Sequence, residues 1–282
     1  SQLDIFKSNK FKTYGVDPAK NIYKISSKKH KVICDFFTEK VIKKFNQKFD
    51  FIISQNSFAH NPNPLKFLKN AKKLMHEKSS LIIQTSQADM CYEFDTIYHE
   101  HINFFNIKSM MKLLKRSNLK LHDVAKDPIH GSSYLFVIKL NSNQKNIQTI
   151  VKKEKFLNFK YYKKWGKNCK ELVDKIKIRL NKISKNNVVI GYGAAAKANT
   201  FLNFSGIKFD FIIDDNKLKQ NKFCPGSRIP IKPIESINRY NNDIYIVPLA
   251  WNFYKEIKQR VIKVRKKNRD KFIICYPKFK IY

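Results

Sequence analysis

Short apolar runs alternate with amphipathic stretches along the first half of the chain, a pattern that favours an α/β fold. Residues 11–16, 31–34, 49–53 and 81–83 are rich in β-branched and aromatic residues and are predicted strands. Helices are predicted after Asn61-Pro62-Asn63-Pro64 and after Asn106, where apolar residues return at helical spacing. Residues 119–124 and 134–140 are predicted to close the series as an antiparallel pair.

The second half repeats this alternation after a polar link at residues 141–148. Residues 150–183 have a helical pattern, with a predicted buried stripe of Phe156, Phe159, Trp165, Leu172, Ile176 and Leu180. Strands are predicted at 187–190, 209–213, 243–247 and 271–275, with a helix at 254–264. We therefore predict two α/β domains, residues 1–142 and residues 150–282, of which the second is smaller.

Composition excludes several classes of protein. The chain has 282 residues, 43% of them hydrophobic and 13% aromatic, which is ample for a packed core. No apolar run approaches the ~20 residues of a membrane helix, and residues 1–6 do not resemble a signal peptide. The five cysteines are scattered singly, which argues against zinc and disulfides and fits a reducing cytoplasm. No metal is expected.

The formal net charge of +35 raises the question of nucleic acid as a partner. Only seven of the 57 basic residues are Arg, however, and Arg is the residue suited to bidentate phosphate and base recognition. The lysines are spread along the whole chain. We expect solvated faces and nonspecific polyanion affinity at low salt, with no specific nucleic-acid partner and no membrane.

Four polar side chains in a row, Tyr98-His99-Glu100-His101, follow the predicted strand 81–83 and a polar segment. They suit a loop at the carboxyl edge of a parallel sheet, where acid, base and oxyanion donor are needed together. A surface polar loop, or structural histidines at a strand end, explains them equally well.

A second motif, Gly191-Tyr192-Gly193-Ala194-Ala195-Ala196-Lys197, joins a predicted strand to a predicted helix. With Asp214 about twenty residues on, it is similar to a dinucleotide fingerprint, in which backbone donors and the helix dipole favour phosphate. NAD or a nucleotide diphosphate fits this cradle, and a tight turn without a ligand is the alternative. Asp17, at the end of the first predicted strand, stands where such folds hold a ribose, although turns use Asp too.

Five stretches occur in one order and together resemble the sugar C-methyltransferases, which methylate ring carbons of nucleotide-linked deoxysugars. They are Ser57-Phe58-Ala59-His60-Asn61-Pro62, Tyr98-His99-Glu100-His101, residues 191–200, Pro225-Gly226-Ser227-Arg228-Ile229-Pro230 and Leu249-Ala250-Trp251-Asn252-Phe253. The resemblance covers essentially the whole chain. It implies a class I methyltransferase-like Rossmann domain followed by a smaller, Rossmann-like domain that binds the nucleotide sugar.

The resemblance also implies a mechanism with S-adenosylmethionine as cofactor. An enolate forms beside a ketone of the sugar, with His101 as general base, Glu100 orienting it, and His60 or Tyr98 donating to the enolate oxygen. His99 is expected to be structural. Strand-end positions suited to the cofactor's ribose and adenine are Asp17, Asp35, Phe36 and Gln55. Positions expected to bind the nucleotide sugar are Gly191, Gly193, Lys197, Asn199, Asp214 and Trp251.

The family's N-terminal zinc module, first strand and glycine-rich cofactor loop have no counterpart in this sequence, so we expect a truncated member whose cofactor binding and turnover are weak. Two other readings stay open: an NAD(P)-dependent sugar-nucleotide oxidoreductase centred on residues 191–214, and an inactive scaffold that binds polyanions. Calorimetric titration with S-adenosylhomocysteine, NAD and a dTDP-sugar separates the three.

Overall fold

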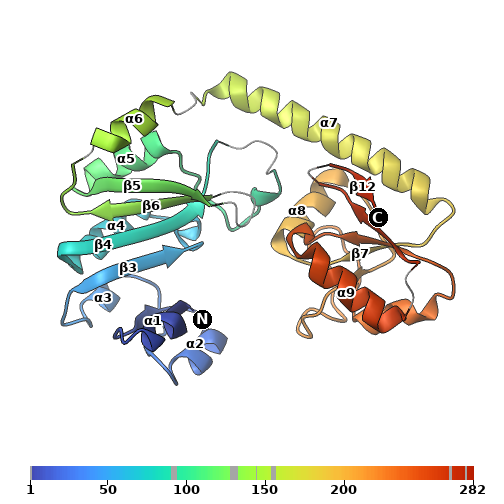
Figure 1. Ribbon diagram of the computed structural model, residues 1–282, viewed down its shortest axis with the longest axis horizontal. Coiled ribbons are helices and arrows are strands. Elements are labelled where there is room, and N and C mark those ends of the chain that lie inside the picture. The colour runs from blue at the N-terminus through green and yellow to red at the C-terminus, as the bar shows by residue number, and fades with distance from the viewer. Residues whose placement is uncertain are drawn as a thin grey trace. The chain divides into compact units, whose positions relative to one another are not determined.

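The computed structural model describes residues 2–89, 94–127, 133–143, 145–153, 157–266, 269–276 and 278–282. The chain forms two compact units (Figure 1). The first contains residues 1–88 and 102–154, and the second contains residues 89–101 and 155–282.

The strands of the first unit form two sheets. The smaller one pairs β1 (Tyr14–Val16) with β2 (Lys31–Ile33) in parallel. The larger one has the order β3-β4-β6-β5, in which β3 (Phe49–Gln55) and β4 (Met75–Ser86) are parallel. β6 (Ser133–Lys139) is antiparallel to both β4 and β5 (Lys120–Asp127), as the apolar runs predict.

Helices cover this larger sheet and are capped as the sequence indicates. α4 (Pro64–Lys73) has Asn63 as N-cap, whose side chain accepts the amide of Lys66. α5 (Ile107–Arg116) begins with a capping box between Asn106 and Ser109. The apolar faces of both helices pack with the buried strand residues in one core, around Phe58, Leu81, Met110 and Phe136. The remaining helical elements of the unit are α1 (Gln2–Ser8), α2 (Lys20–Ser26), α3 (Glu39–Ile42), the 3₁₀ turn η1 (Phe58–His60) and α6 (Lys145–Lys153).

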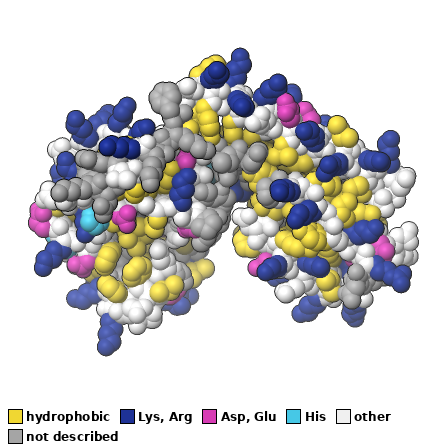
Figure 2. Space-filling model, turned by 45° about the horizontal axis from the view of Figure 1, so that its top comes forward, with side chains coloured by type: hydrophobic (Ala, Val, Ile, Leu, Met, Phe, Trp, Pro, Cys, Tyr) yellow, Lys and Arg dark blue, Asp and Glu magenta, His cyan; other side chains and the backbone are white. Residues whose placement is uncertain are grey.

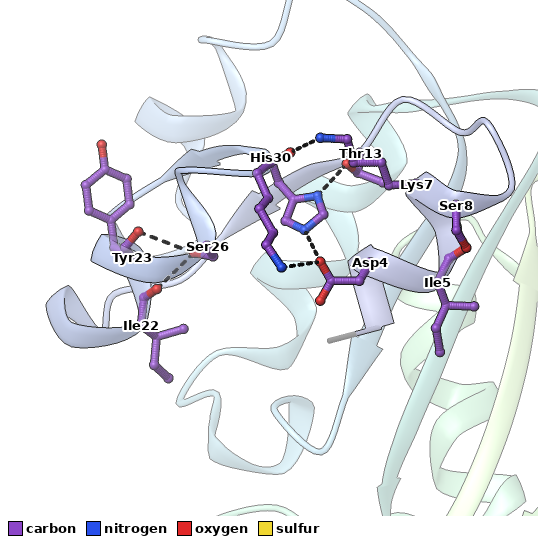
Figure 3. A network of polar contacts seen from close by, with 10 residues as sticks. Asp4, Ile5, Lys7, Ser8, Thr13, Ile22, Tyr23, Ser26 and His30 are labelled. Atoms are coloured by element: carbon purple, nitrogen blue, oxygen red, sulfur yellow. Dashed lines mark hydrogen bonds and ion pairs between the residues drawn. The ribbon is translucent and has the colours of Figure 1, made fainter.

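A buried histidine ties α1 to the small sheet (Figure 3). His30 is 7% exposed; its Nδ1 lies 2.7 Å from the Thr13 hydroxyl and its Nε2 lies 3.2 Å from an Asp4 carboxylate oxygen. Lys7 of α1 also donates to the carbonyl of Lys29, at 2.7 Å. α1 has no fully buried residue, so these polar contacts attach it together with the ring of Phe6, which packs edge to face on Phe11 at a centroid distance of 5.6 Å.

Segment 89–101 leaves the first unit between β4 and α5 and packs with the second. Its described part contains the 3₁₀ turn η2 (Phe94–Thr96). The residues on either side of the segment pair with each other: the amide of Ala88 donates to the Phe105 carbonyl at 2.9 Å, and the amide of Phe105 donates to the Ser86 carbonyl at 3.2 Å.

The second unit contains a six-stranded sheet of order β12-β11-β10-β7-β8-β9, parallel except for β12. Its strands are β7 (Val189–Tyr192), β8 (Ile212–Ile213), β9 (Ile231–Lys232), β10 (Tyr245–Pro248), β11 (Lys271–Ile274) and β12 (Lys280–Ile281). Its helical elements are α7 (Phe159–Ser184), α8 (Ala196–Ser205), η4 (Ile234–Arg239), η5 (Trp251–Phe253) and α9 (Tyr254–Arg265). Apolar clusters on the two sides of β7 form its core.

The predicted stripe of α7 is partly wrong. Phe159 is 82% exposed, and the fully buried positions are Cys169, Val173, Ile176 and Leu180. Phe159 is the first residue of the helix and precedes the turns that pack on the unit, so its apolar character does not bury it. Phe156 lies outside the described residues, and α6 already begins at Lys145, inside the expected polar link.

Basic side chains are scattered over the visible face and do not gather in one patch (Figure 2).

Candidate functional site

Tyr98 and His101 form a stacked, hydrogen-bonded pair. The Tyr98 hydroxyl lies 2.7 Å from Nε2 of His101, and the ring centroids are 4.0 Å apart at an interplanar angle of 32°. The amide of His101 donates to the carbonyl of Tyr98 at 3.0 Å. This tight turn brings side chains three positions apart onto each other, so the Tyr-x-x-His spacing is what makes the pair.

The second ring nitrogen of His101 fixes the tautomer. Nδ1 lies 2.8 Å from the backbone carbonyl of Thr96, and a carbonyl oxygen can only accept a hydrogen bond. Nδ1 therefore carries a proton, and in the neutral ring Nε2 is the basic nitrogen, to which the Tyr98 hydroxyl donates. A base oriented by a backbone acceptor and hydrogen-bonded to a phenol can receive and relay a proton.

The other two predicted catalytic residues are placed differently. Glu100 is exposed, and the orienting contact on Nδ1 of His101 comes from Thr96. His60 is exposed at the end of η1 in the first unit, whereas Tyr98 and His101 belong to the second. The catalytic roles of Glu100 and His60 stay predictions.

The predicted cofactor residues stand at strand ends of the first unit. Asp17 follows β1, and its carboxylate accepts the amide of Ala19 at 2.8 Å, while its own amide donates to the carbonyl of Ile33 in β2. Asp35 and Phe36 follow β2, with Phe36 68% exposed. The parallel pairing of β1 and β2 brings these three residues to one sheet edge. Gln55 ends β3, in the larger sheet, and is exposed.

Packing explains both glycines of the second-unit motif. Gly191 lies inside β7, where a Cβ would stand 3.0 Å from side-chain atoms of Ile212 and Leu249. Gly193 has φ +99°, and a Cβ there would stand 2.9 Å from Cβ of Ala250. The glycines therefore let the Leu249-Ala250 segment approach the strand-to-helix turn.

Asp214 closes the same turn. Asp214 is 8% exposed. Its carboxylate accepts hydrogen bonds from the amide of Ala194 at 2.8 Å and from the amide of Asn216 at 2.9 Å. Nζ of Lys219 lies 3.3 Å from the same carboxylate. Asp214 therefore hydrogen-bonds to the protein's own backbone. A ligand-binding role for Asp214 stays a prediction.

The remaining predicted sugar-binding residues stand on or near α8. Its N-cap, Ala195, provides no side-chain cap, and Lys197 lies in its first turn. Asn199 donates to the Ala195 carbonyl at 3.1 Å, while its buried Oδ1 has no hydrogen-bond partner among the described residues. Trp251 stacks on Tyr276, with ring centroids 5.1 Å apart.

Sequence reasoning missed a buried polar group at the end of β4. Gln84 is 3% exposed, and its amide donates to the carboxylate of Asp127 at 2.7 Å and to the hydroxyl of Ser133 at 3.2 Å. It pairs in register with the predicted cofactor residue Gln55. The available signal was the polar run 84–87 directly after an apolar strand.

Two further features are absent from the described residues. Among them, no three His, Cys, Asp or Glu side chains are grouped so as to hold a metal ion. No helix in the described ranges is long and apolar enough to cross a membrane.

Comparison with known proteins assigns a family. Residues 128–277, more than half of the chain, match the family described as "C-methyltransferase C-terminal domain". The chain belongs to this C-methyltransferase family. Residues 2–124 match a second family, described as "Methyltransferase domain". C-methyltransferase NovU of Streptomyces niveus is 24% identical over 295 residues, which cover 98% of this chain and 70% of NovU.

Some solved structures have a partial likeness to this chain. An S-adenosylmethionine-dependent methyltransferase from Archaeoglobus fulgidus gives a TM-score of 0.40 at 14% identity, covering 49% of this chain and 80% of the other. An S-adenosylmethionine-dependent methyltransferase from Clostridium acetobutylicum gives a TM-score of 0.38 at 14% identity, and the likeness covers 48% of this chain and 77% of the other. LepI in complex with SAM gives a TM-score of 0.38 at 12% identity, and the likeness covers 46% of this chain and 36% of LepI.

The family assignment confirms four predictions: the family, the α/β class I methyltransferase fold, the enzyme class and S-adenosylmethionine as the cofactor of that class. The sheet order β3-β4-β6-β5, with its antiparallel end, agrees with that fold.

Proposed function

We propose that this C-methyltransferase acts on a nucleotide-linked keto-deoxysugar and that it forms an enolate before the methyl group is transferred to carbon. The observation that carries the proposal is the Tyr98–His101 pair, because its basic Nε2 and defined tautomer are what abstraction of an α-proton requires. The coarser activity, C-methylation, follows from the family.

Proton abstraction uses the pair as a relay. The bond from the sugar's α-carbon to hydrogen breaks, its electron pair moves to the ketone oxygen, and the Tyr98 oxygen takes the proton while passing its own to Nε2 of His101. The imidazolium that results is stabilised by the Thr96 carbonyl on Nδ1. The enolate oxygen needs a donor, and we assign this role to His60.

The residues of the first unit that would hold the cofactor fit its adenosine half. Asp17 and Asp35 offer carboxylate oxygens at the carboxyl edge of β1 and β2, and Phe36 presents an exposed aromatic face beside them. Such groups suit ribose hydroxyls and an adenine ring. When bound, S-adenosylmethionine supplies the methyl group as an electrophilic carbon on sulfur.

For the sugar's pyrophosphate we propose the first turn of α8 with Lys197. The uncapped helix start leaves amide donors in its first turn, and the lysine adds positive charge. Asn199 Oδ1, a buried acceptor without a partner in the described structure, supports a ligand donor at this end of the helix. The closed turn at Asp214 disfavours the alternative of a nicotinamide dinucleotide, whose ribose that acid would hold.

Proton exchange tests the enolate step without any methyl donor. A dTDP-linked keto-deoxysugar is incubated with the protein in D₂O, and loss of the α-proton signal is followed by NMR. We expect exchange above the protein-free rate, abolished in His101→Gln and slowed about a hundredfold in Tyr98→Phe, in the range typical of general acid–base groups. His99→Gln is the matched control, because His99 is close to the pair in sequence and its imidazole is predicted to be structural.

His60→Gln separates the donor role from the base role. His60→Gln should slow proton exchange on the sugar. It should not change the shape of the pH–rate profile, because that shape is set by the Tyr98–His101 pair. Exchange that is equally fast in wild type, His101→Gln and the protein-free solution would overturn the proposed function.

A further inference from the structure

Phe94 is the one large apolar side chain of the described part of segment 89–101 that is buried in the second unit's core. It is 5% exposed, whereas its segment neighbour Ile97 is 45% exposed. Its ring lies 5.4 Å from that of Phe204 in α8 and 6.1 Å, edge to face, from that of Tyr276 after β11. Tyr276 in turn stacks on Trp251.

The start of the same segment, Asp89, also belongs to this unit. The phenol of Tyr162, in α7, has its pKa raised by burial and, secondarily, by the carboxylate of Asp89. By contrast, the residue that follows the segment, Ile102, donates its amide to the Ala59 carbonyl of the first unit at 3.1 Å.

Along the chain, the Tyr98–His101 pair follows Phe94 and precedes Ile102. Phe94 begins the turn η2, the amide of Ile97 donates to the Phe94 carbonyl at 3.1 Å, and the orienting carbonyl of Thr96 belongs to the same turn. The Thr96 carbonyl can hold Nδ1 of His101 only while this turn is formed. Burial of the Phe94 ring favours the turn, because it is the largest apolar gain available to the described part of the segment.

We propose that Phe94 is a positioning residue: by seating in a socket of Phe204 and Tyr276, it folds η2 and so aligns the Tyr98–His101 pair. This inference rests on the proposed function for its catalytic consequence, but not for its structural one.

Hydrogen exchange of the full chain, read by mass spectrometry on peptides covering residues 94–101, tests the anchor. In Phe94→Ala we expect the amides of Ile97 and His101 to exchange at least about tenfold faster, with strands β7 and β10 unchanged. Phe94→Leu should restore most of the protection. Phe204→Ala removes one wall of the socket from a half-exposed position of α8, so it should give the same effect even if Phe94→Ala fails to fold.

Phe159→Ala is the matched control, because this ring of the same unit is almost fully exposed. Proton exchange on the keto-sugar should slow in Phe94→Ala and Phe204→Ala, while the dissociation constant of the dTDP-sugar changes less than about twofold. Unchanged amide protection in both variants would overturn the anchor. A different outcome separates the two proposals. If the variants lose amide protection but the wild-type protein exchanges no sugar proton, the proposed function is overturned and the anchoring role of Phe94 stands.

Discussion

A neutral imidazole has one donor and one acceptor nitrogen, and the fold assigns both in His101. A backbone carbonyl takes the donor side and a phenol occupies the acceptor side. The backbone acceptor holds the tautomer without adding a negative charge. An additional orienting role for Glu100 stays a prediction.

Thiol reactivity provides a test of burial at the level of single residues. Burial raises the pKa of the Cys275 thiol to about 12 and also raises that of Cys224. A raised pKa lowers the thiolate fraction, and the thiolate is the nucleophile, so both should resist alkylation at about pH 8. Among the described cysteines, Cys34 is the one that is only half-buried, so it should react before Cys169, Cys224 and Cys275. Peptide mass spectrometry after iodoacetamide treatment checks this, with denatured protein as the control; rapid native labelling of Cys275 would contradict it.

Lys197→Ala tests the proposed pyrophosphate site. Loss of a charge-assisted phosphate contact costs about 1.5–3 kcal/mol, so the dissociation constant of a dTDP-sugar should rise tenfold or more. Binding of S-adenosylhomocysteine should not change. Lys182→Ala, an exposed lysine of α7 in the same unit, is the control. Calorimetry that shows equal dTDP-sugar affinity for wild type and Lys197→Ala would remove this lysine from the site.

At the scale of elements, local signals predicted most of the fold. The apolar runs marked the strands, and the caps at Asn63 and Asn106 marked the starts of α4 and α5, because both signals act between residues close in sequence. What sequence could not predict depends on distant partners. The packing of Phe94 against Phe204 and the closure of the glycine turn by Asp214 are of this kind. The Tyr-x-x-His spacing was visible, but not the turn that makes it a pair.

The attachment of α1 is an element whose stability can be measured. His30→Ala leaves the Thr13 hydroxyl and the Asp4 carboxylate without their buried partner, which should destabilise this part of the first unit by about 1–3 kcal/mol. Trypsin cleavage after Lys7 and Lys10 should accelerate accordingly. His122→Ala is the control, because His122 is exposed and its only described side-chain contact is with Ser142. Equal cleavage rates in the two variants would show that α1 is held by other contacts.

At the scale of the whole molecule, the first unit holds two separate sheets, and among the described strands each sheet has open edges. β1 and β2 pair only with each other, and β3 and β5 each have one described partner. Phe11, which precedes β1, and Phe51 of β3 are each nearly half exposed, and their ring centroids are 6.2 Å apart in an edge-to-face contact. This aromatic contact attaches the small sheet to the larger one within the first unit.

The proposed division of roles predicts that methyl transfer and the enolate step can be separated. Asp17, Asp35 and Phe36 are proposed to hold the adenosine half of S-adenosylmethionine, whereas Tyr98 and His101 are proposed to act on the sugar. Methyl transfer requires sulfur, methyl carbon and carbanion in line. Asp35→Asn should therefore weaken the binding of S-adenosylhomocysteine, measured by calorimetry, and slow methyl transfer to the keto-sugar, while proton exchange proceeds at the wild-type rate. Proton exchange that slows as much as methyl transfer would contradict this separation.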